Sequence, residues 1–307
     1  FDGKTKDEVV DDIHSYQNEA DIPLLIGVDE EGGTVVRVSS NPNLRETPFL
    51  SPKDTYADGG WDAVKQDAEE KADLLLSLGI NVNLAPVCDM TSDEYGFMYD
   101  RSFSSDVDME NRYVRTVVES SKSKKLGTVL KHFPGYGNNS DTHTGIAYDD
   151  RDYSEFENTD FKPFYQGIES GADCILVSHN IVNCMDSEYP ASLSQKVHDI
   201  LRNEFKFDGV IMTDDLIMDA ITDLTGDEAA AVTAAKCGND LLCCSSVDTQ
   251  YPAVLEAVQN GEIPEAQVDA SVKRILKWKQ NLGIFNIDTY QKKVKSTEPT
   301  DTVGSEE

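Results

Sequence analysis

Residues 127–145 read GTVLKHFPGYGNNSDTHTG and decide the class of fold that the sequence predicts. Lys131 and His132 stand at the end of an apolar run at 127–131, and a long loop rich in Gly and Asn follows them. A buried strand that ends in polar groups and a long loop is typical of α/β enzymes, which build their active sites at strand carboxyl ends. We therefore predict a functional loop after this strand.

The same pattern recurs along the chain. Strands are predicted at residues 23–28, 81–85, 127–131, 173–177, 209–212 and 240–244, and a further short run at 34–38 fits either a strand or a loop. Amphipathic helices are predicted at 62–78, 108–126, 161–170, 193–205, 227–236, 251–260 and 265–282. Apolar runs that each precede a helix predict a parallel sheet covered on both faces.

Polar side chains at the predicted strand ends decide between a doubly wound sheet and a barrel. They are Asp29, Asp89, Lys131, His132, Ser178, His179, Asp214 and Asp215. Barrels collect such groups from many strands, whereas doubly wound folds gather them at one crevice. We predict an α/β fold, a TIM-type (β/α)8 barrel over residues 1–287, followed by a polar, acidic, disordered tail at 288–307.

Composition excludes several functions. The 307 residues hold 27 Lys+Arg and 57 Asp+Glu, a net charge of −30, which disfavours nucleic acid and anionic membranes as partners. No run approaches the ~20 apolar residues of a membrane span. The six cysteines form no CxxC pair and predict buried free thiols rather than a metal or disulfide framework. We expect a monomer without a cofactor.

Two motifs carry candidate catalytic groups. In the Asp141-x-His143 motif the carboxylate can orient the imidazole and raise its pKa, as an acid/base requires, although the spacing alone is common in loops. In GVIMTDDLIM, Asp214 directly follows a predicted strand, where a carboxylate can attack an anomeric carbon or ligate a metal. Helix caps are the alternative for Asp214 and Asp215, and we expect Asp215 to cap the next helix.

The segment 26–38, IGVDEEGGTVVRV, lacks a phosphate-binding pattern, and its three consecutive acids would repel phosphate. It suits hydrogen bonding to hydroxyl groups, and the alternative is a surface hairpin with an acidic patch. His179 either faces the sheet mouth or is satisfied by its neighbours. His14 and His198 lie on predicted helices and are expected at the surface.

Together these segments resemble glycoside hydrolase family 3, and within it the β-N-acetylhexosaminidase branch. The matching runs, in order over residues 20–285, are IPLLIGVDEEGGTVVRV, NVNLAPVCD, DRSF, KHFPGYG followed by DTH, LVSHN and GVIMTDDL. The resemblance implies retaining, exo-acting hydrolysis of terminal N-acetyl-β-D-hexosamine residues through a covalent intermediate. It implies Asp214 as nucleophile, His143 as acid/base and Asp141 as its partner. It also implies the sugar contacts Asp29, Arg37, Arg101, Lys131 and His132.

The sequence departs from that pattern in three ways. Tyr136 stands where many relatives carry His, the second α/β domain of the β-glucosidase branch does not follow, and no strand matches the first strand of the barrel. We therefore expect a barrel that lacks its first strand. We expect a secreted or cell-surface bacterial lipoprotein without its signal region, with a cytoplasmic protein as the alternative.

Other activities stay open at this point. A β-glucosidase or a phosphorylase would use the same residues. A metal-dependent barrel would use His132, His143, His179 and Asp214, but no two of these histidines lie on one strand at ligand spacing. A sugar-binding barrel without turnover is the remaining alternative. A muropeptide fragment, chitobiose and a glycoprotein glycan all remain possible substrates.

Overall fold

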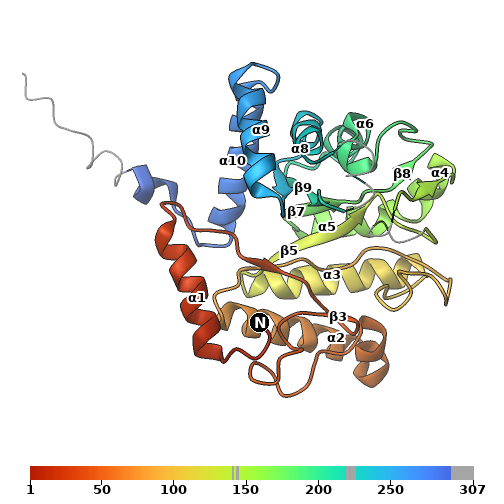
Figure 1. Ribbon diagram of the computed structural model, residues 1–307. Coiled ribbons are helices and arrows are strands. Elements are labelled where there is room, and N and C mark those ends of the chain that lie inside the picture. Colours follow the sequence, from red (N-terminus) through yellow and green to blue (C-terminus); the bar gives the residue numbers. More distant parts are fainter. Residues whose placement is uncertain (140–141, 143–144, 219–220, 222–225, 292–307) are drawn as a thin grey trace, which may run out of the picture.

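The structure, a computed structural model, describes residues 1–139, 142, 145–218, 221 and 226–291. Parallel strands alternate with helices along the chain (Figure 1), which confirms the predicted α/β class. The tail predicted at 288–307 lies outside the described residues from position 292 onward, and residues 287–291 are helical.

A curled parallel sheet forms the centre of the molecule. Its strand order is β1 (Gly27–Val28), β4 (Val82–Asn83), β5 (Gly127–Phe133), β7 (Cys174–Val177), β9 (Val210–Asp215) and β10 (Leu241–Cys243). Each of the six predicted strands overlaps one of these and is confirmed. Within the described residues β1 and β10 are the sheet edges and do not pair with each other, so barrel closure and a missing first strand stay predictions.

Two short strand pairs lie outside this sheet. The antiparallel hairpin of β2 (Glu30–Gly32) and β3 (Val35–Val36) accounts for the run at 34–38. Gly32 has a φ of 104°, and a Cβ there would collide with the carbonyl oxygen of Leu50, so the hairpin requires glycine at this position. The second pair, β6 (Tyr148–Asp149) and β8 (Ile181–Val182), lies beyond the loop that follows β5.

Helices occupy the connections. They are α1 (Lys6–Glu19), α2 (Pro52–Ser77), α3 (Val107–Ser123), α4 (Tyr153–Asn158), α5 (Phe161–Ser170), α6 (Gln195–Asp199), α8 (Asp227–Lys236), α9 (Val247–Gln259) and α10 (Glu265–Asn281), with a 3₁₀ turn η2 (Ala191–Leu193) and a π turn η3 (Ile200–Glu204). Figure 1 shows α2 and α3 side by side below the sheet. Helix α2 begins earlier than predicted, since Ser51 caps its amino end and Gly59 and Gly60 interrupt its helical pattern.

Apolar side chains cover both faces of the sheet, as predicted. On one face they pack against aromatic residues of the helices: Leu130, Ile175, Ile211, Phe161, Phe164 and Phe205. On the other face Val129, Leu176 and Met212 pack against Trp278 and Leu282 at the end of α10. Alternate residues of one strand thus enter opposite cores.

Side-chain burial corrects two smaller predictions. The cysteines are free thiols, but Cys184 is exposed and Cys243 and Cys244 are only half-buried. His198 is buried at 2 % exposure, and its Nδ1 donates to the Ser194 carbonyl at 2.7 Å. His198 lies against Cys237 and Gly238 at the end of α8, which is a tertiary contact that helical spacing does not reveal. No helix in the described part of the chain has the length and apolar character of a membrane span.

Helix α3 carries a buried carboxyl group at Glu110. Burial raises the pKa of Glu110 well above its ordinary value of 4.5, although the backbone N–H of Ser104 donates to its Oε2 at 2.8 Å. Nearby Asp89 raises this pKa further. The folded protein therefore holds Glu110 protonated at a pH where the unfolded chain is already ionised, which costs stability as pH rises above 4.5.

Replacing Glu110 with Gln is expected to stabilise the protein at pH 7, because the amide oxygen can still accept from Ser104 and no charge has to be neutralised. The gain should shrink toward pH 4.5, where the unfolded carboxyl is also protonated. Urea unfolding of both proteins between pH 4.5 and 8 measures this difference. A constant difference across that range would show that ionisation of Glu110 is not responsible.

Candidate active site

A buried cation lies at the carboxyl end of β5. The Nζ of Lys131 lies 2.5 Å from Asp29 Oδ1 and 2.6 Å from Glu31 Oε1, and the residue is 2 % exposed. Burial alone lowers the pKa of Lys131, but the two carboxylates outweigh it and the net pKa is raised. Lys131 therefore stays charged, and a charged ammonium group is a strong hydrogen-bond donor, as its predicted role as a sugar contact requires.

Glu31 joins this lysine to a second cation and was not among the predicted site residues. Arg101 donates to both of its oxygens, from Nε at 3.0 Å and from Nη2 at 2.8 Å. Burial raises the pKa of Glu31, but Lys131 and Arg101 together lower it to about 2. Three adjacent acids at 29–31 suggest a solvated patch, and only partners far along the chain make Glu31 a buried counter-ion.

His132 is fixed in one tautomer by its partners. Its Nε2 lies 3.2 Å from Arg101 Nη2, which can only donate, so Nε2 accepts. Its Nδ1 therefore carries the proton and donates to Asp89 Oδ2 at 2.7 Å. Asp89 also accepts from the backbone N–H of His132 and of Tyr136. Asp89 thus orients His132 and the first part of the following loop.

Asp214 lies near the end of β9, two strands from Lys131 in the sheet. Burial raises its pKa, but His179, His132, the backbone N–H of Asp215 and the ammonium group of Lys131 together outweigh that effect, and the net pKa lies below its usual value. Its Oδ1 accepts the backbone N–H of Asp215 at 2.9 Å. Asp214 is consequently an ionised carboxylate beside a cationic cluster, which is the state of a glycosidase nucleophile.

The two neighbours of Asp214 have structural partners. His179 Nε2 donates to the carbonyl of Asp215 at 3.0 Å, and its Nδ1 lies 2.7 Å from the hydroxyl of Ser192. Both ring nitrogens of His179 therefore have hydrogen-bond partners. The imidazole also lies close enough to Asp214 to lower the pKa of that carboxylate. The carboxylate of Asp215 accepts from Ser245 at the end of β10 and from the N–H of Ile217. The segment that it was expected to cap lies in part outside the described residues, so that role stays a prediction.

The structure describes some of the predicted site residues and leaves two of them outside the described part of the chain. Asp29, Arg101, Lys131 and His132 are connected in one contact network through Glu31, and their role as sugar contacts stays a prediction. Arg37 is exposed, and its guanidinium makes no hydrogen bond with another described residue. Asp141 and His143 lie outside the described residues. Between them Thr142 is buried, and its hydroxyl lies 2.5 Å from that of Tyr136, the residue that replaces the expected His.

No three His, Cys, Asp or Glu side chains of the described chain are grouped to hold a metal ion. Each described histidine of the metal-dependent alternative has another partner: His132 contacts Asp89 and Arg101, and His179 contacts Ser192. The side chains described at this edge of the sheet therefore hold one another through hydrogen bonds and ion pairs.

An α/β sheet whose carboxyl edge gathers an ionised aspartate, a buried lysine and an oriented histidine is typical of barrel-type enzymes. The family model described as glycosyl hydrolase family 3 N terminal domain matches residues 2–278. The chain belongs to glycosyl hydrolase family 3.

Individual relatives agree with that membership. The chain is 32 % identical over 252 residues to a beta-hexosaminidase of Hydrogenovibrio crunogenus, covering 80 % of this chain and 70 % of that protein. It superposes with a TM-score of 0.85 and 29 % identity on a family 3 beta-N-acetylglucosaminidase from Paenibacillus, covering 92 % of this chain. The chain spans 55 % of that Paenibacillus protein. With M. tuberculosis LpqI the TM-score is 0.81 and the identity 29 %, over 91 % of this chain and 84 % of the other.

Proposed function

We propose that this family 3 glycosidase is a retaining, exo-acting β-N-acetylglucosaminidase that removes terminal N-acetyl-β-D-hexosamine residues. The observation that carries the proposal is the ionised Asp214 at the carboxyl edge of the sheet, beside the cluster of Lys131, Arg101 and His132. The names of the relatives support the N-acetylhexosamine preference.

In the first step Asp214 attacks the anomeric carbon as the bond to the leaving oxygen breaks. Its Oδ1 is already held by the N–H of Asp215, so Oδ2 forms the glycosyl ester. Protonated His143, oriented by Asp141, donates its proton to the leaving oxygen. In the second step neutral His143 takes a proton from water, the hydroxide oxygen attacks the same carbon, and Asp214 leaves as carboxylate.

The sugar-binding role falls to the network around Lys131. Asp29 has 37 % of its side chain exposed and can accept from sugar hydroxyls, whereas Lys131 and Arg101 are held in place by buried Glu31. A rigid, charged array suits hydroxyl groups because it needs little reorganisation on binding. We include His132 and Arg37 among the contacts, Arg37 from the exposed end of the segment that follows β3.

We also propose that residues 1–287 are one domain and that the six-stranded sheet is the larger part of a (β/α)8 barrel. The parallel order of all six strands and the polar cluster at one edge support this architecture. In a closed barrel, the strands that complete the sheet would lie between its two edge strands, β1 and β10.

The substrate preference has a direct test. We expect kcat/KM for p-nitrophenyl N-acetyl-β-glucosaminide to exceed that for the p-nitrophenyl β-glucoside by about a hundredfold or more, as expected of a site that hydrogen-bonds the acetamido group. The free sugar should be the product with and without phosphate, and EDTA should leave the rate unchanged. Equal rates on both glycosides, a sugar 1-phosphate product, loss of activity in EDTA, or binding without turnover would each favour one of the alternatives.

A further inference from the structure

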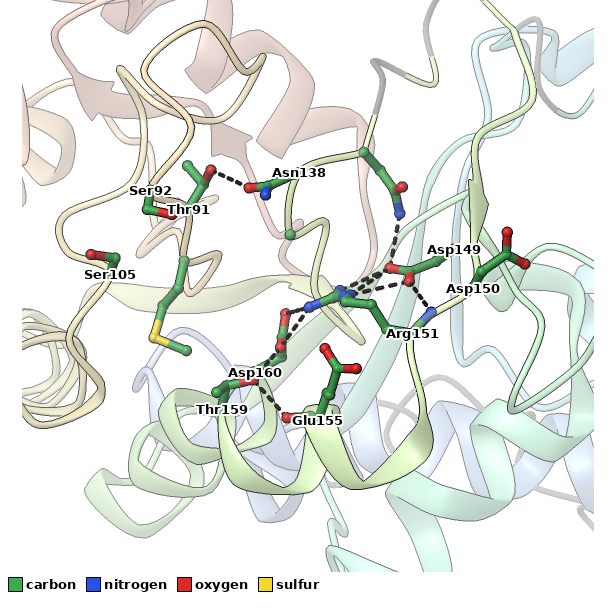
Figure 2. Close-up of a pocket in the computed structure, with 13 residues that line it drawn as sticks. Thr91, Ser92, Ser105, Asn138, Asp149, Asp150, Arg151, Glu155, Thr159 and Asp160 are labelled. Atoms are coloured by element: carbon green, nitrogen blue, oxygen red, sulfur yellow. Dashed lines mark hydrogen bonds and ion pairs between the residues drawn. The ribbon is translucent and has the colours of Figure 1, made fainter.

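An arginine with three protein partners lies beside the loop that follows β5. Figure 2 shows Arg151 between Asp149, from the end of β6, and Asp160, which precedes α5, in the wall of a pocket of about 650 Å³. Arg151 Nε and Nη2 contact Asp149 at 3.1 and 2.8 Å, and Nη1 contacts both oxygens of Asp160 at 2.9 and 3.1 Å. The remaining N–H of Nη2 reaches the carbonyl of Gly135 at 3.3 Å.

Each of the three guanidinium nitrogens of Arg151 therefore donates to a protein acceptor, and the two carboxylates and the carbonyl hold the group in one plane. With 26 % of its side chain exposed, Arg151 lies at the pocket wall as a cross-link between three segments of the chain. A planar fork that meets two carboxylates and one carbonyl fixes orientation as well as distance. The contacts therefore assign to Arg151 a role in geometry.

What Arg151 fixes is the described part of the loop. Gly135 supplies the carbonyl, and Asn139 donates to Asp149 Oδ2 at 2.9 Å. Gly137 has a φ of 56°, and a Cβ there would lie 2.7 Å from the guanidinium carbon of Arg151. Gly135 and Gly137 therefore lie against Arg151, and Asn139 is tied to its partner Asp149. Asp89 holds the same loop through the N–H of Tyr136.

We propose that Arg151 is a positioning residue for the acid/base step: by fixing residues 135–139 it sets where the chain enters the segment that carries Asp141 and His143. This inference rests on the proposed function, since it needs His143 to protonate the leaving group. Displacing an acid by about 1 Å can cost about a hundredfold in rate. The loss should fall on the step that needs the proton and spare the attack by Asp214.

The test compares two leaving groups in Arg151→Lys. Lysine keeps the charge but lacks the planar fork, so it cannot hold both carboxylates and the carbonyl. Phenyl N-acetyl-β-glucosaminide needs protonation of its leaving oxygen, whereas the 2,4-dinitrophenyl glycoside departs without it. We expect kcat/KM to fall about tenfold to a hundredfold on the phenyl substrate and by far less on the dinitrophenyl substrate.

Arg202→Lys is the matched control. Arg202 also bridges backbone carbonyls and a buried carboxylate, those of Phe207, Gly209 and Asp240, but at the opposite end of β9. It should lose comparable stability without a change in leaving-group dependence. Asn139→Ala, which removes one link and leaves the ion pairs of Arg151 intact, should show the same substrate-dependent loss to a smaller extent.

Equal losses on both substrates in Arg151→Lys, or no loss on either, would overturn the inference, and so would the same selective loss in Arg202→Lys. Should Arg151→Lys not fold, Asn139→Ala decides, with equal rates on both substrates counting against positioning. Wild-type protein that turns over neither substrate would instead overturn the proposed function, and the inference with it.

Discussion

Replacing Asp214 with Asn is expected to lower kcat by at least about a thousandfold, because an amide cannot form the glycosyl ester. The pKa of Asp214 lies below its usual value, so removal of its charge also removes the attraction to a developing oxocarbenium ion. KM should change much less than kcat, since the proposed sugar contacts lie on β5 and on the segments that follow β1, β3 and β4. Steady-state rates on p-nitrophenyl N-acetyl-β-glucosaminide measure both quantities.

Asp215→Asn is the control for that variant. Asp215 is the adjacent carboxylate, and its partners are Ser245 and the N–H of Ile217 rather than the cationic cluster. Most of the activity should remain in this variant. A comparable loss in both variants, or substantial turnover by Asp214→Asn, would contradict the assignment of the nucleophile.

Replacing Glu31 with Gln is expected to destabilise the protein by about 3 to 5 kcal/mol, because it leaves Lys131 and Arg101 buried with too little negative charge. Glu31 contacts both cations directly and has 2 % of its side chain exposed. Asp29→Asn removes the other partner of Lys131, but 37 % of the Asp29 side chain is exposed. Its loss should be closer to about 1 kcal/mol, and urea unfolding at pH 7 compares the two.

The same variant has a defined pH signature. The pKa of Glu31 falls from 4.5 to about 2 on folding, so its stabilisation is present above pH 4.5 and is lost as pH falls toward 2. That shift corresponds to about 3 kcal/mol of stability. Wild-type protein should lose this amount in that window and Glu31→Gln should not. Parallel unfolding curves for the two proteins between pH 4.5 and 2 would rule out Glu31 as the counter-ion of the cluster.

The sequence predicted the sheet well because buried parallel strands leave continuous apolar runs. Residues 127–131 and 173–177 stand out for this reason, and β5 and β7 follow them closely. Helix α2 was predicted less well, since Gly59 and Gly60 break the periodicity that a helix requires while the chain continues beyond them as helix. Tertiary packing overrides local pattern there.

The same physical difference separates the site residues that were predicted from those that were missed. Lys131 and His132 were predicted because they follow a strand directly, and strand ends converge at one edge of a parallel sheet. Glu31 and the orienting role of Asp89 were missed because they act through contacts with residues 43 to 100 positions away. Arg151 gave no signal at all, since a single arginine in an acidic stretch is indistinguishable from a solvated residue until Asp149, Asp160 and Gly135 surround it.

The most direct test of the proposed mechanism is mass spectrometry of protein incubated with a 5-fluoro N-acetylglucosaminyl fluoride, a donor that slows the second step. The mechanism predicts one added glycosyl group, located on Asp214 within the tryptic peptide 207–236. The adduct should be absent from Asp214→Ala and should disappear as activity returns. Inactivation with the sugar on a different residue, or steady turnover with no adduct, would contradict a covalent glycosyl-Asp214 intermediate.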